Sequence, residues 1–455
     1  MNDTICALAT APGGALGIIR ISGAQTLEIL SRIFTKNLAD ARPNTIHYGH
    51  IVEQAAVPQQ QTATIVDEVL ISVFRAPHSY TGEESAEISC HGSRYILNKV
   101  LELLIQQGCR MANPGEFTQR AYLNGKMDLT QAEAVADLIA STNQATHQMA
   151  LSQLRGHFSS KLAQLREQLL KLTSLLELEL DFSDHEDLEF ADRSELMELT
   201  KEIDTHITKL ARSFETGQAL KQGIPVAIVG KTNVGKSTLL NALLKDDRAI
   251  VSDVHGTTRD TIEDTIDIKG VTFRFIDTAG IRQTQDTVEQ IGIERTYAAI
   301  DKARIVLWII DSNPSSDEIS NILQRIKDKH LIVVRNKTDK GDINNFTLPH
   351  HSLVSISAKF GKGIDKLEQA IYEAADIPAL SDNDVIVTNA RHYDALIRSH
   401  DCIQRIVDGL QMQLSGDLLS EDLRQALDTL AEITGGQITP NEVLGNIFKN
   451  FCVGK

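Results

Sequence analysis

Hydrophobic residues recur along the chain with two kinds of spacing, which divide it into mixed α/β and helical regions. Up to about residue 118, short apolar runs at 18–21 and 68–74 predict strands, and the spacing at 95–105 predicts a helix. Residues 54–64 are rich in glutamine and alanine and poor in other apolar side chains, so we expect a loop there. Charged residues beside the glycine turns of this region, such as Glu83, are expected to be solvated.

A helical region follows the boundary at Pro114-Gly115. Apolar residues recur every three or four positions from Leu151 to Leu176, and again from Leu196 to Phe214 after an acidic break at 181–192. This spacing predicts amphipathic helices. Such stripes usually form seams inside a helical bundle, and a coiled coil between two copies is the alternative.

Residues 217 to about 380 alternate short apolar runs with helical segments. The runs that predict buried strands are 226–229, 304–310, 331–334 and 353–356. A hairpin is expected at 266–276, with its turn at Lys269-Gly270. Alternation of strands and helices predicts a mostly parallel, doubly wound sheet.

The pattern is helical again from about residue 385. Apolar side chains from Leu396 to Leu410 share one helical face, and Ser420 is expected to cap the next helix. Residues 439–442 read Thr-Pro-Asn-Glu, which predicts a capping box with proline at the first helical position. Two helical blocks therefore flank one α/β domain. The economical architecture inserts that domain into a single helical bundle, and two separate helical domains are the alternative.

The predicted fold is multidomain, α/β plus all-α. At 455 residues the chain is long enough for about three domains. The predicted parts are an N-terminal α/β domain at 1–118, a helical domain in two pieces at 119–216 and 381–455, and a second α/β domain at 217–380.

Composition narrows the class of protein. The net charge of −16 argues against generic nucleic acid binding, which needs Lys and Arg to neutralise phosphates. Contact with a nucleic acid would require a local basic patch or a partner. No apolar run approaches 18 residues and the N-terminus lacks signal-peptide features, so a cytoplasmic protein without a membrane span is expected. The five cysteines form no C-x-x-C pair, which indicates neither a disulfide framework nor a zinc site.

The strongest chemical signal is Gly230-Lys-Thr-Asn-Val-Gly-Lys-Ser237, which matches the phosphate-binding pattern G-x-x-x-x-G-K-[ST]. In such a loop the backbone N–H groups converge on the β-phosphate. Lys236 would reach the β and γ oxygens, and the Ser237 hydroxyl would ligate Mg²⁺. A predicted strand and helix flank the loop, and the helix N-terminus favours an anion. An ordinary glycine turn is the alternative for this motif alone.

Two motifs after this loop contain groups suited to the metal and the γ-phosphate. The Thr258 hydroxyl, in Gly256-Thr-Thr-Arg-Asp260, could complete the coordination of Mg²⁺. Asp277, in Asp277-Thr-Ala-Gly280, could hold the metal through water, and the Gly280 N–H could contact the γ-phosphate.

Two further motifs contain groups suited to guanine. Asp339, in Asn336-Lys-Thr-Asp339, could accept hydrogen bonds from guanine N1–H and N2–H₂, which adenine cannot supply. A backbone N–H of Ser357-Ala-Lys359 could meet guanine O6. All these motifs, in this order, resemble the G domain of GTPases.

Hydrolysis needs a device other than the usual glutamine. Ras-like proteins carry that residue just after D-T-A-G to orient water, and here the position is Ile281. Asn233 and the segment 252–257 suggest a bound monovalent cation, held by an amide oxygen and backbone carbonyls where an arginine finger acts. For Asn233 the alternative is a turn-favouring residue in a tight loop.

The whole chain resembles the MnmE (also TrmE) family of tRNA uridine-5-carboxymethylaminomethyl modification GTPases. Four stretches carry the resemblance: 17–23, 114–129, the G-domain motifs, and the terminal Cys452-Val-Gly-Lys455. The Pro-Gly-Glu-Phe run that begins at Pro114 and the terminal C-x-G-K are far more specific than any single nucleotide motif.

The resemblance implies an N-terminal folate-binding and dimerisation domain, a helical domain interrupted by a Ras-like G domain, and a homodimer. It implies an FAD-carrying partner, MnmG, in a heterotetramer or larger complex. Together they would modify C5 of the wobble uridine, position 34, of certain tRNAs. The one-carbon unit would come from 5-formyl- or methylene-tetrahydrofolate, and K⁺ would promote G-domain dimerisation and GTP hydrolysis.

The resemblance also implies roles for individual residues. Glu289 would orient the catalytic water. The folate contacts would be Arg20, Glu87, Lys126 and Lys455. The K⁺ ligands would be Asn233, Ser252, Val254 and Thr257. The Mg²⁺ ligands would be Ser237 and Thr258. The GTP site would comprise Asn233, Val234, Gly235, Lys236, Ser237, Thr238, Ser252, Asp253, Val254, His255, Gly256, Thr257, Thr258, Asp277, Thr278, Ala279, Gly280, Asn336, Lys337, Asp339, Ser357, Ala358 and Lys359.

Two positions have a second interpretation. Cys452 is a candidate for the modification chemistry, and a frayed terminus is the alternative. His255 stands where a small or aliphatic residue is expected, although only its backbone need contact the cation. For the whole chain, the alternative function is a GTP-dependent ribosome-assembly or signalling switch without substrate chemistry. A folate-dependent transferase with a vestigial G domain is disfavoured, because the G motifs are intact.

Overall fold

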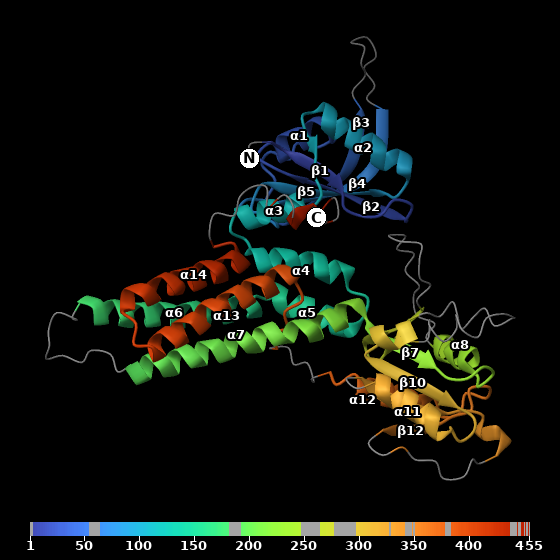
Figure 1. The fold of residues 1–455 in the computed structure, drawn as a ribbon. Helices are drawn as coiled ribbons and strands as arrows, with labels where there is room; N and C mark the ends of the chain where they lie inside the picture. Colours follow the sequence, from blue (N-terminus) through green and yellow to red (C-terminus); the bar gives the residue numbers. More distant parts are fainter. Residues whose placement is uncertain are drawn as a thin grey trace. The chain divides into compact units, whose positions relative to one another are not determined.

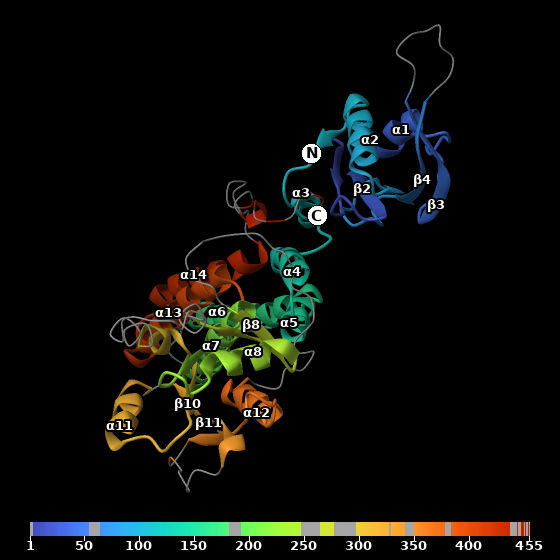
Figure 2. The ribbon, with the colours of Figure 1, turned by 90° about the vertical axis from the view of Figure 1, so that its right-hand side faces the viewer.

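The computed structural model describes residues 3–53, 64–181, 193–246, 264–276, 297–326, 329–341, 351–377 and 384–436, with residues 348, 444, 447–449, 451 and 454. Contacts divide the chain into two compact units (Figures 1 and 2). The first unit takes in Met1–Ala140, Ala150–Asp204 and Arg398–Lys455, and the second takes in Ser141–Met149 and Thr205–Ile397. Within the described ranges, no helix has both the length and the apolar character that crossing a membrane requires.

The first unit begins with an α/β fold. Its described strands are β1 (Ile5–Leu8), β2 (Leu16–Ser22), β3 (Thr45–Glu53), β4 (Thr64–Phe74), β5 (Ser85–His91) and β6 (Arg110–Met111). They form one sheet in the order β3-β4-β5-β2-β1-β6, with only the β1–β6 pair parallel. The strands predicted at 18–21 and 68–74 are confirmed, as is the helix at 95–105. The loop expected at 54–64 lies almost entirely outside the described residues.

The two faces of this sheet differ. Cross-strand register places Ile21 beside Ala86, and both are fully buried under α1 (Thr26–Ile33) and α2 (Arg94–Gln106). The next cross-strand pair is Arg20 and Glu87, whose side chains lie on the opposite face of the sheet. Because side chains alternate along a strand, that face carries polar and exposed apolar groups instead of a core. Its β1 edge is covered by α3 (Glu116–Leu123), whose Phe117 packs on Ile5 and Ala7.

The helices of the bundle are α4 (Leu129–Ala140), α5 (Gln144–Leu154), α6 (His157–Asp181), α7 (Arg193–Gln222), α13 (Ala390–Gln411) and α14 (Gly416–Thr434). α14 packs against α6 and α4, so Ala150–Asp204 and Arg398–Lys455 share one unit, as the insertion architecture predicts (Figure 1). Residues 205–222 of α7 and 390–397 of α13 belong to the second unit. The apolar stripe predicted from Leu151 to Leu176 belongs to two helices, because Gly156, with φ +82°, ends the first.

One capping prediction is wrong and another is not described. α14 begins at Gly416 after the N-cap position Ser415, and the Ser420 hydroxyl donates to the Gly416 carbonyl at 2.9 Å. Ser420 therefore lies inside the helix, where its hydroxyl bonds back to the preceding turn. The capping box expected at 439–442 lies outside the described residues.

The second unit is a doubly wound α/β domain, as predicted. Its described strands are β7 (Ile224–Val229), β8 (Asp264–Ile268), β9 (Val271–Phe275), β10 (Ile305–Ile310), β11 (His330–Arg335) and β12 (Ser352–Ser355). They lie in the order β12-β11-β10-β7-β9-β8, and only β8 is antiparallel to its neighbour. α8 (Lys236–Asp246) and α12 (Ile364–Ala374) cover one face, and α11 (Ser316–Arg325) covers the other.

The hairpin between β8 and β9 turns at Lys269-Gly270, both with positive φ, as a tight hairpin turn requires. The start of α5 is bonded to this turn. The Ala145 N–H donates to the Gly270 carbonyl at 2.9 Å, and Asn143 Nδ2 donates to Thr272 Oγ1 at 2.8 Å. Since Ala145 is also buried in the domain core, residues 141–149 belong to the second unit.

Candidate functional site

The phosphate-binding loop joins β7 to α8. Its glycines are required by close packing as well as by the ligand. A Cβ on Gly230 would lie 2.4 Å from the Ile309 carbonyl oxygen, and one on Gly235 would lie 2.3 Å from Asn336 Nδ2. Both glycines also have positive φ. Any larger residue would therefore displace the loop from β10 and β11.

Lys236 is the first residue of α8, and its ammonium group folds back over the loop. Nζ donates to the Gly230 carbonyl at 2.6 Å and to the Lys231 carbonyl at 2.7 Å. Burial lowers the pKa of Lys236. Ser237 and Thr238 follow in the first turn of the helix, where the N-terminal dipole favours an anion. This arrangement places the Lys236 ammonium group and the N-terminus of α8 at the phosphate loop.

Asn336 holds three of the predicted motifs together. It is 4% exposed and directly follows β11. Its Nδ2 donates to the Val234 carbonyl at 2.8 Å, and its Oδ1 accepts from the Ala358 N–H at 3.0 Å. One side chain thus fixes the phosphate loop against the segment predicted to meet guanine O6. The sequence pattern did not predict this bridging contact.

Lys337 bonds to the phosphate loop from the other side. Its Nζ donates to the Asn233 carbonyl at 2.6 Å and to Asp311 Oδ2 at 2.7 Å. The backbone oxygen of Asn233 is therefore engaged, which leaves the side-chain amide as the donor group suited to a monovalent cation. Asp311 was not predicted as a site residue, and its position directly after the buried strand β10 was the available signal.

Asp339, the carboxylate predicted to recognise guanine, lies in a short 3₁₀ helix, Thr338–Lys340. Its Oδ1 accepts from the Ser357 hydroxyl at 2.6 Å, and this hydrogen bond lowers the pKa of Asp339. The carboxyl group is thus kept ionised, which suits it to accept two hydrogen bonds. Lys359 Nζ stands 5.3 Å from the ring centroid of the adjacent Phe360. The structure brings Asp339, Ser357 and Ala358 together beside Asn336.

Twelve predicted residues of the nucleotide site lie outside the described residues: Ser252, Asp253, Val254, His255, Gly256, Thr257, Thr258, Asp277, Thr278, Ala279, Gly280 and Glu289. The β8–β9 hairpin connects the two segments that contain them. The donor types fit the expected ions, because Mg²⁺ prefers hydroxyl, carboxylate and water oxygens. No group of three or more His, Cys, Asp or Glu side chains in the described part of the chain could hold a metal.

A cavity of about 340 Å³ adjoins the phosphate loop between β10 and α11. Gly230 and Lys231 line one end, and apolar side chains such as Trp308 and Ile322 form much of the wall. Lys236, Asn336 and Asp339 do not line it. It shares Val234 and Asp311 with the surroundings of the phosphate loop, although the ammonium and carboxylate groups predicted to bind phosphate and guanine lie outside it.

The predicted folate residues lie in the first unit. Arg20 and Glu87 are direct cross-strand partners, and Glu87 Oε1 accepts from Arg20 Nε at 2.9 Å and Nη2 at 2.8 Å. Arg20 Nη1 donates to the Gly454 carbonyl at 3.3 Å, so the chain end reaches this pair. Lys126 Nζ donates to the Pro77 carbonyl at 3.0 Å. Lys455 and Cys452 lie outside the described residues.

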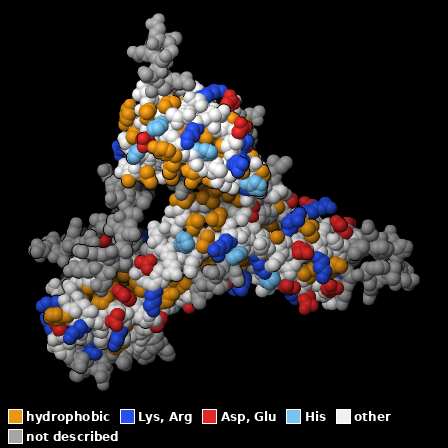
Figure 3. Space-filling view, turned by 180° about the vertical axis from the view of Figure 1, so that it is seen from behind, with side chains coloured by type: hydrophobic (Ala, Val, Ile, Leu, Met, Phe, Trp, Pro, Cys, Tyr) orange, Lys and Arg blue, Asp and Glu red, His pale blue; other side chains and the backbone are white. Residues whose placement is uncertain are grey.

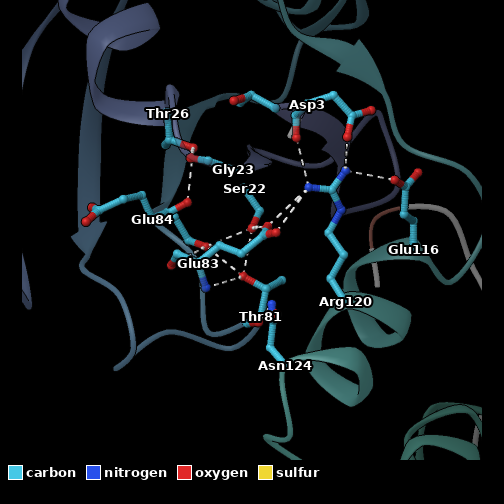
Figure 4. Close-up of polar contacts among 12 residues, drawn as sticks. Asp3, Ser22, Gly23, Thr26, Thr81, Glu83, Glu84, Glu116, Arg120 and Asn124 are labelled. Atoms are coloured by element: carbon cyan, nitrogen blue, oxygen red, sulfur yellow. Dashed lines mark hydrogen bonds and ion pairs between the residues drawn. The ribbon is translucent and has the colours of Figure 1, made fainter. Parts of the chain in front are cut away.

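The surroundings of Arg20 include residues that the sequence did not single out. The rings of Tyr80 and Phe117 have their centroids 5.4 and 5.7 Å from its guanidinium carbon. Glu83, expected to be a solvated loop charge, instead bonds to the buried Arg120 (Figure 4). The acidic Glu83 and the basic Arg120 are far apart in sequence, so no local pattern could reveal the pair.

Comparison with known proteins covers the entire chain. The family model "MnmE helical domain" matches residues 129–452, and "GTP-binding protein TrmE N-terminus" matches residues 4–126. A protein of Phocaeicola vulgatus called "tRNA modification GTPase MnmE" is 54% identical over an alignment 495 positions long, which covers 100% of this chain and 99% of the relative. Proteins of the same name from Bacteroides thetaiotaomicron and Parabacteroides distasonis are 54% and 52% identical, with 100% of both chains covered.

Proposed function

We propose that this chain, which belongs to the MnmE family of tRNA modification GTPases, hydrolyses GTP with the help of K⁺ and, with an FAD-carrying partner, modifies C5 of the wobble uridine of certain tRNAs. The observation that carries the proposal is the meeting of three nucleotide motifs around Asn336. The engagement of the Asn233 carbonyl by Lys337 supports the potassium part, because it leaves the amide oxygen for a cation.

In this mechanism each described group has a separate task. Lys236 and the N-terminus of α8 hold the phosphates, and Asp339 selects guanine. Ser237, with Thr258, would ligate Mg²⁺, and Asn233, with the segment 252–257, would ligate K⁺. The bound ions would supply positive charge that offsets the charge developing on the phosphate oxygens. Glu289 would orient the attacking water.

The modification itself would involve a folate and a partner. Arg20, Glu87 and Lys126 would bind 5-formyl- or methylene-tetrahydrofolate, with Lys455 at the chain end beside them; the contact between Arg20 and Gly454 supports this grouping. An FAD-carrying partner, MnmG, would complete the chemistry on tRNA in the cytoplasm. Mass spectrometry of tRNA nucleosides from cells lacking this chain tests the step, and an unchanged wobble uridine would refute it.

The potassium proposal predicts a large salt effect. GTP turnover should be about a hundredfold faster in KCl than in matched NaCl, since removal of one charge-stabilising group in a closed site costs roughly that factor.

Glu289→Ala should lose turnover by about 10²–10⁴-fold while still binding GTP, because only the positioning of water is removed. Initial rates of phosphate release and binding of a fluorescent GTP analogue measure the two effects.

Glu373→Ala, at an exposed carboxylate on α12, is the matched control and should keep the wild-type turnover. Equal rates in KCl and NaCl would remove the potassium site at Asn233 and favour a conventional switch GTPase. Loss of GTP binding in Glu289→Ala would show that this residue does more than orient water.

An exposed apolar face of the N-terminal sheet supports the homodimer. Ile46, Tyr48 and Leu70 are 67%, 55% and 46% exposed, and Tyr48 is the cross-strand partner of Leu70. Figure 3 shows hydrophobic side chains gathered on the surface of this part of the molecule. Contiguous exposed apolar surface of this kind marks an interaction site.

Leu70→Glu should therefore convert the dimer to a monomer, because it would bury a carboxylate at the interface. The dissociation constant should rise by about a hundredfold or more, measured by light scattering of eluted protein over a dilution series. Leu418→Glu, at a leucine 60% exposed in α14, is the control and should stay dimeric. A dimer that survives Leu70→Glu would place the interface on another surface.

A further inference from the structure

A buried arginine on α3 ties this helix to the start of the chain. Arg120 is 1% exposed, and its Nη2 donates to Asp3 Oδ1 at 2.8 Å and to Glu116 Oε1 at 3.0 Å (Figure 4). Its Nη1 donates to the Asp3 carbonyl at 2.9 Å. Arg110 adds a second cation to Glu116 at 2.6 Å. Burial raises the pKa of Glu116, and these hydrogen bonds outweigh that effect and hold it below its ordinary value.

The same guanidinium holds the loop between β4 and β5. Arg120 Nη1 lies 3.2 Å from Glu83 Oε2, and the Ser22 hydroxyl donates to that oxygen at 2.8 Å. The Glu83 carbonyl accepts from the Ser79 hydroxyl at 2.6 Å. Figure 4 shows Glu83 between Ser22 on β2 and Arg120 on α3. The loop is thus fixed to a strand on one side and to a helix on the other.

The residue that this loop carries toward Arg20 is Tyr80. Its hydroxyl bonds to Thr118 Oγ1 at 2.8 Å, so α3 fixes the far end of the ring. The ring centroid is 5.4 Å from the Arg20 guanidinium carbon, and 37% of the residue remains exposed. Asn124 Nδ2 donates to the neighbouring Thr81 carbonyl at 2.7 Å. Contacts on both sides of Tyr80 in the chain therefore define its position.

Stability alone does not explain this network. Burying charges is costly, and apolar residues of similar volume often give equal or greater stability. A bonded polar network does, however, specify one geometry, because each partner constrains the next. Here both terminal nitrogens of Arg120 are bonded, whereas its Nε has no hydrogen-bond partner among the described residues. The geometry that this network specifies is the position of the β4–β5 loop, which contains Tyr80, relative to Arg20. The Tyr80 ring in turn lies beside the Arg20 guanidinium, which is paired with Glu87.

We propose that Tyr80 is a further ligand-contact residue, and that Arg120 and Glu83 are positioning residues that hold its ring in place. The ligand class is a reduced folate, whose planar pyrimidine and aminobenzoyl rings suit an exposed aromatic ring. The inference rests on the proposed folate function of Arg20 and Glu87. It adds Tyr80 to the residues that contact the ligand, and it gives the charges of Arg120 and Glu83 a positioning function.

The test is the binding of 5-formyltetrahydrofolate by the full-length chain, measured by isothermal titration calorimetry well below the unfolding temperature. Tyr80→Ala should weaken binding by about tenfold or more, as loss of one stacking ring does. Tyr80→Phe keeps the ring but loses the hydrogen bond to Thr118, so it should weaken binding only several-fold. Glu83→Gln and the milder Thr118→Val should each weaken binding several-fold. GTP turnover in KCl should be unchanged in all four variants, because they lie outside the second unit.

Glu28→Gln, at a carboxylate 62% exposed on α1 of the same unit, is the matched control and should bind folate normally. If Glu83→Gln and Thr118→Val lower the melting temperature but leave the folate dissociation constant unchanged, the network is structural and the positioning role is refuted. Normal binding by Tyr80→Ala would refute the contact. If the unsubstituted chain binds no folate, the proposed folate function itself fails, which is a distinct result.

Discussion

Replacing Asp339 with asparagine should move the nucleotide preference from GTP to xanthosine triphosphate. The aspartate accepts from guanine N1–H and N2–H₂, and an asparagine amide cannot accept both. Xanthine carries an oxygen in place of the 2-amino group, so the asparagine NH₂ can donate to it. Loss of the two charge-assisted hydrogen bonds should weaken GTP binding by roughly 10²–10⁴-fold, measured by competition against a fluorescent nucleotide.

The structure provides a control for this exchange. Ser357 donates to Asp339, and Ser357→Ala removes that support without removing the acceptor. It should weaken GTP binding only modestly and should leave xanthosine triphosphate a poor ligand. If Asp339→Asn binds both nucleotides as the unsubstituted chain does, guanine is recognised elsewhere.

Replacing Asn336 with alanine should cause the largest loss of stability among single changes at the nucleotide site. The buried Val234 carbonyl and Ala358 N–H would each lose their partner. An unsatisfied buried polar group costs about 1–3 kcal/mol, so the two together should cost roughly 2–6 kcal/mol of the free energy of unfolding. GTP affinity should also fall by about tenfold or more, since the phosphate loop would no longer be fixed to the base-recognition segment.

Denaturant unfolding, followed by circular dichroism, gives the stability change, and nucleotide competition gives the affinity change. Asn321→Ala, at an exposed position in α11, serves as the control and should alter neither. Normal GTP affinity in a destabilised Asn336→Ala would mean that the contact supports the fold but does not organise the site.

Contiguous motifs made the phosphate loop and the two helical blocks predictable. Lys236 and Ser237 could be assigned because the loop, its strand and its helix are adjacent in sequence. Short apolar runs also predicted the parallel strands of the second unit, because such strands are buried on both faces of the sheet. The cap predicted at Ser420 was wrong because a serine can also lie inside a helix, where its hydroxyl bonds to the preceding turn.

Contacts between distant residues could not be predicted in this way. The bond from Asn336 to Val234 and that from Arg120 to Asp3 join residues 102 and 117 positions apart. No local periodicity encodes such pairs, and a buried arginine looks the same in sequence as a solvated one. The break at Gly156 was missed for another reason, because the leucine spacing continues through it unchanged.

The order in which the two units are completed follows from their interleaving in the chain. Once Ile397 has left the ribosome, every residue of the second unit has been made, whereas the first unit still lacks the stretch from Arg398 onward. Synthesis of 205–397 takes roughly 10–40 s at about 5–20 residues per second. During that interval the surface of α6 that packs against α14 is not yet covered by that helix. The nascent first unit is therefore a natural client for chaperones, and a truncation before α14 would leave its bundle open and prone to aggregation.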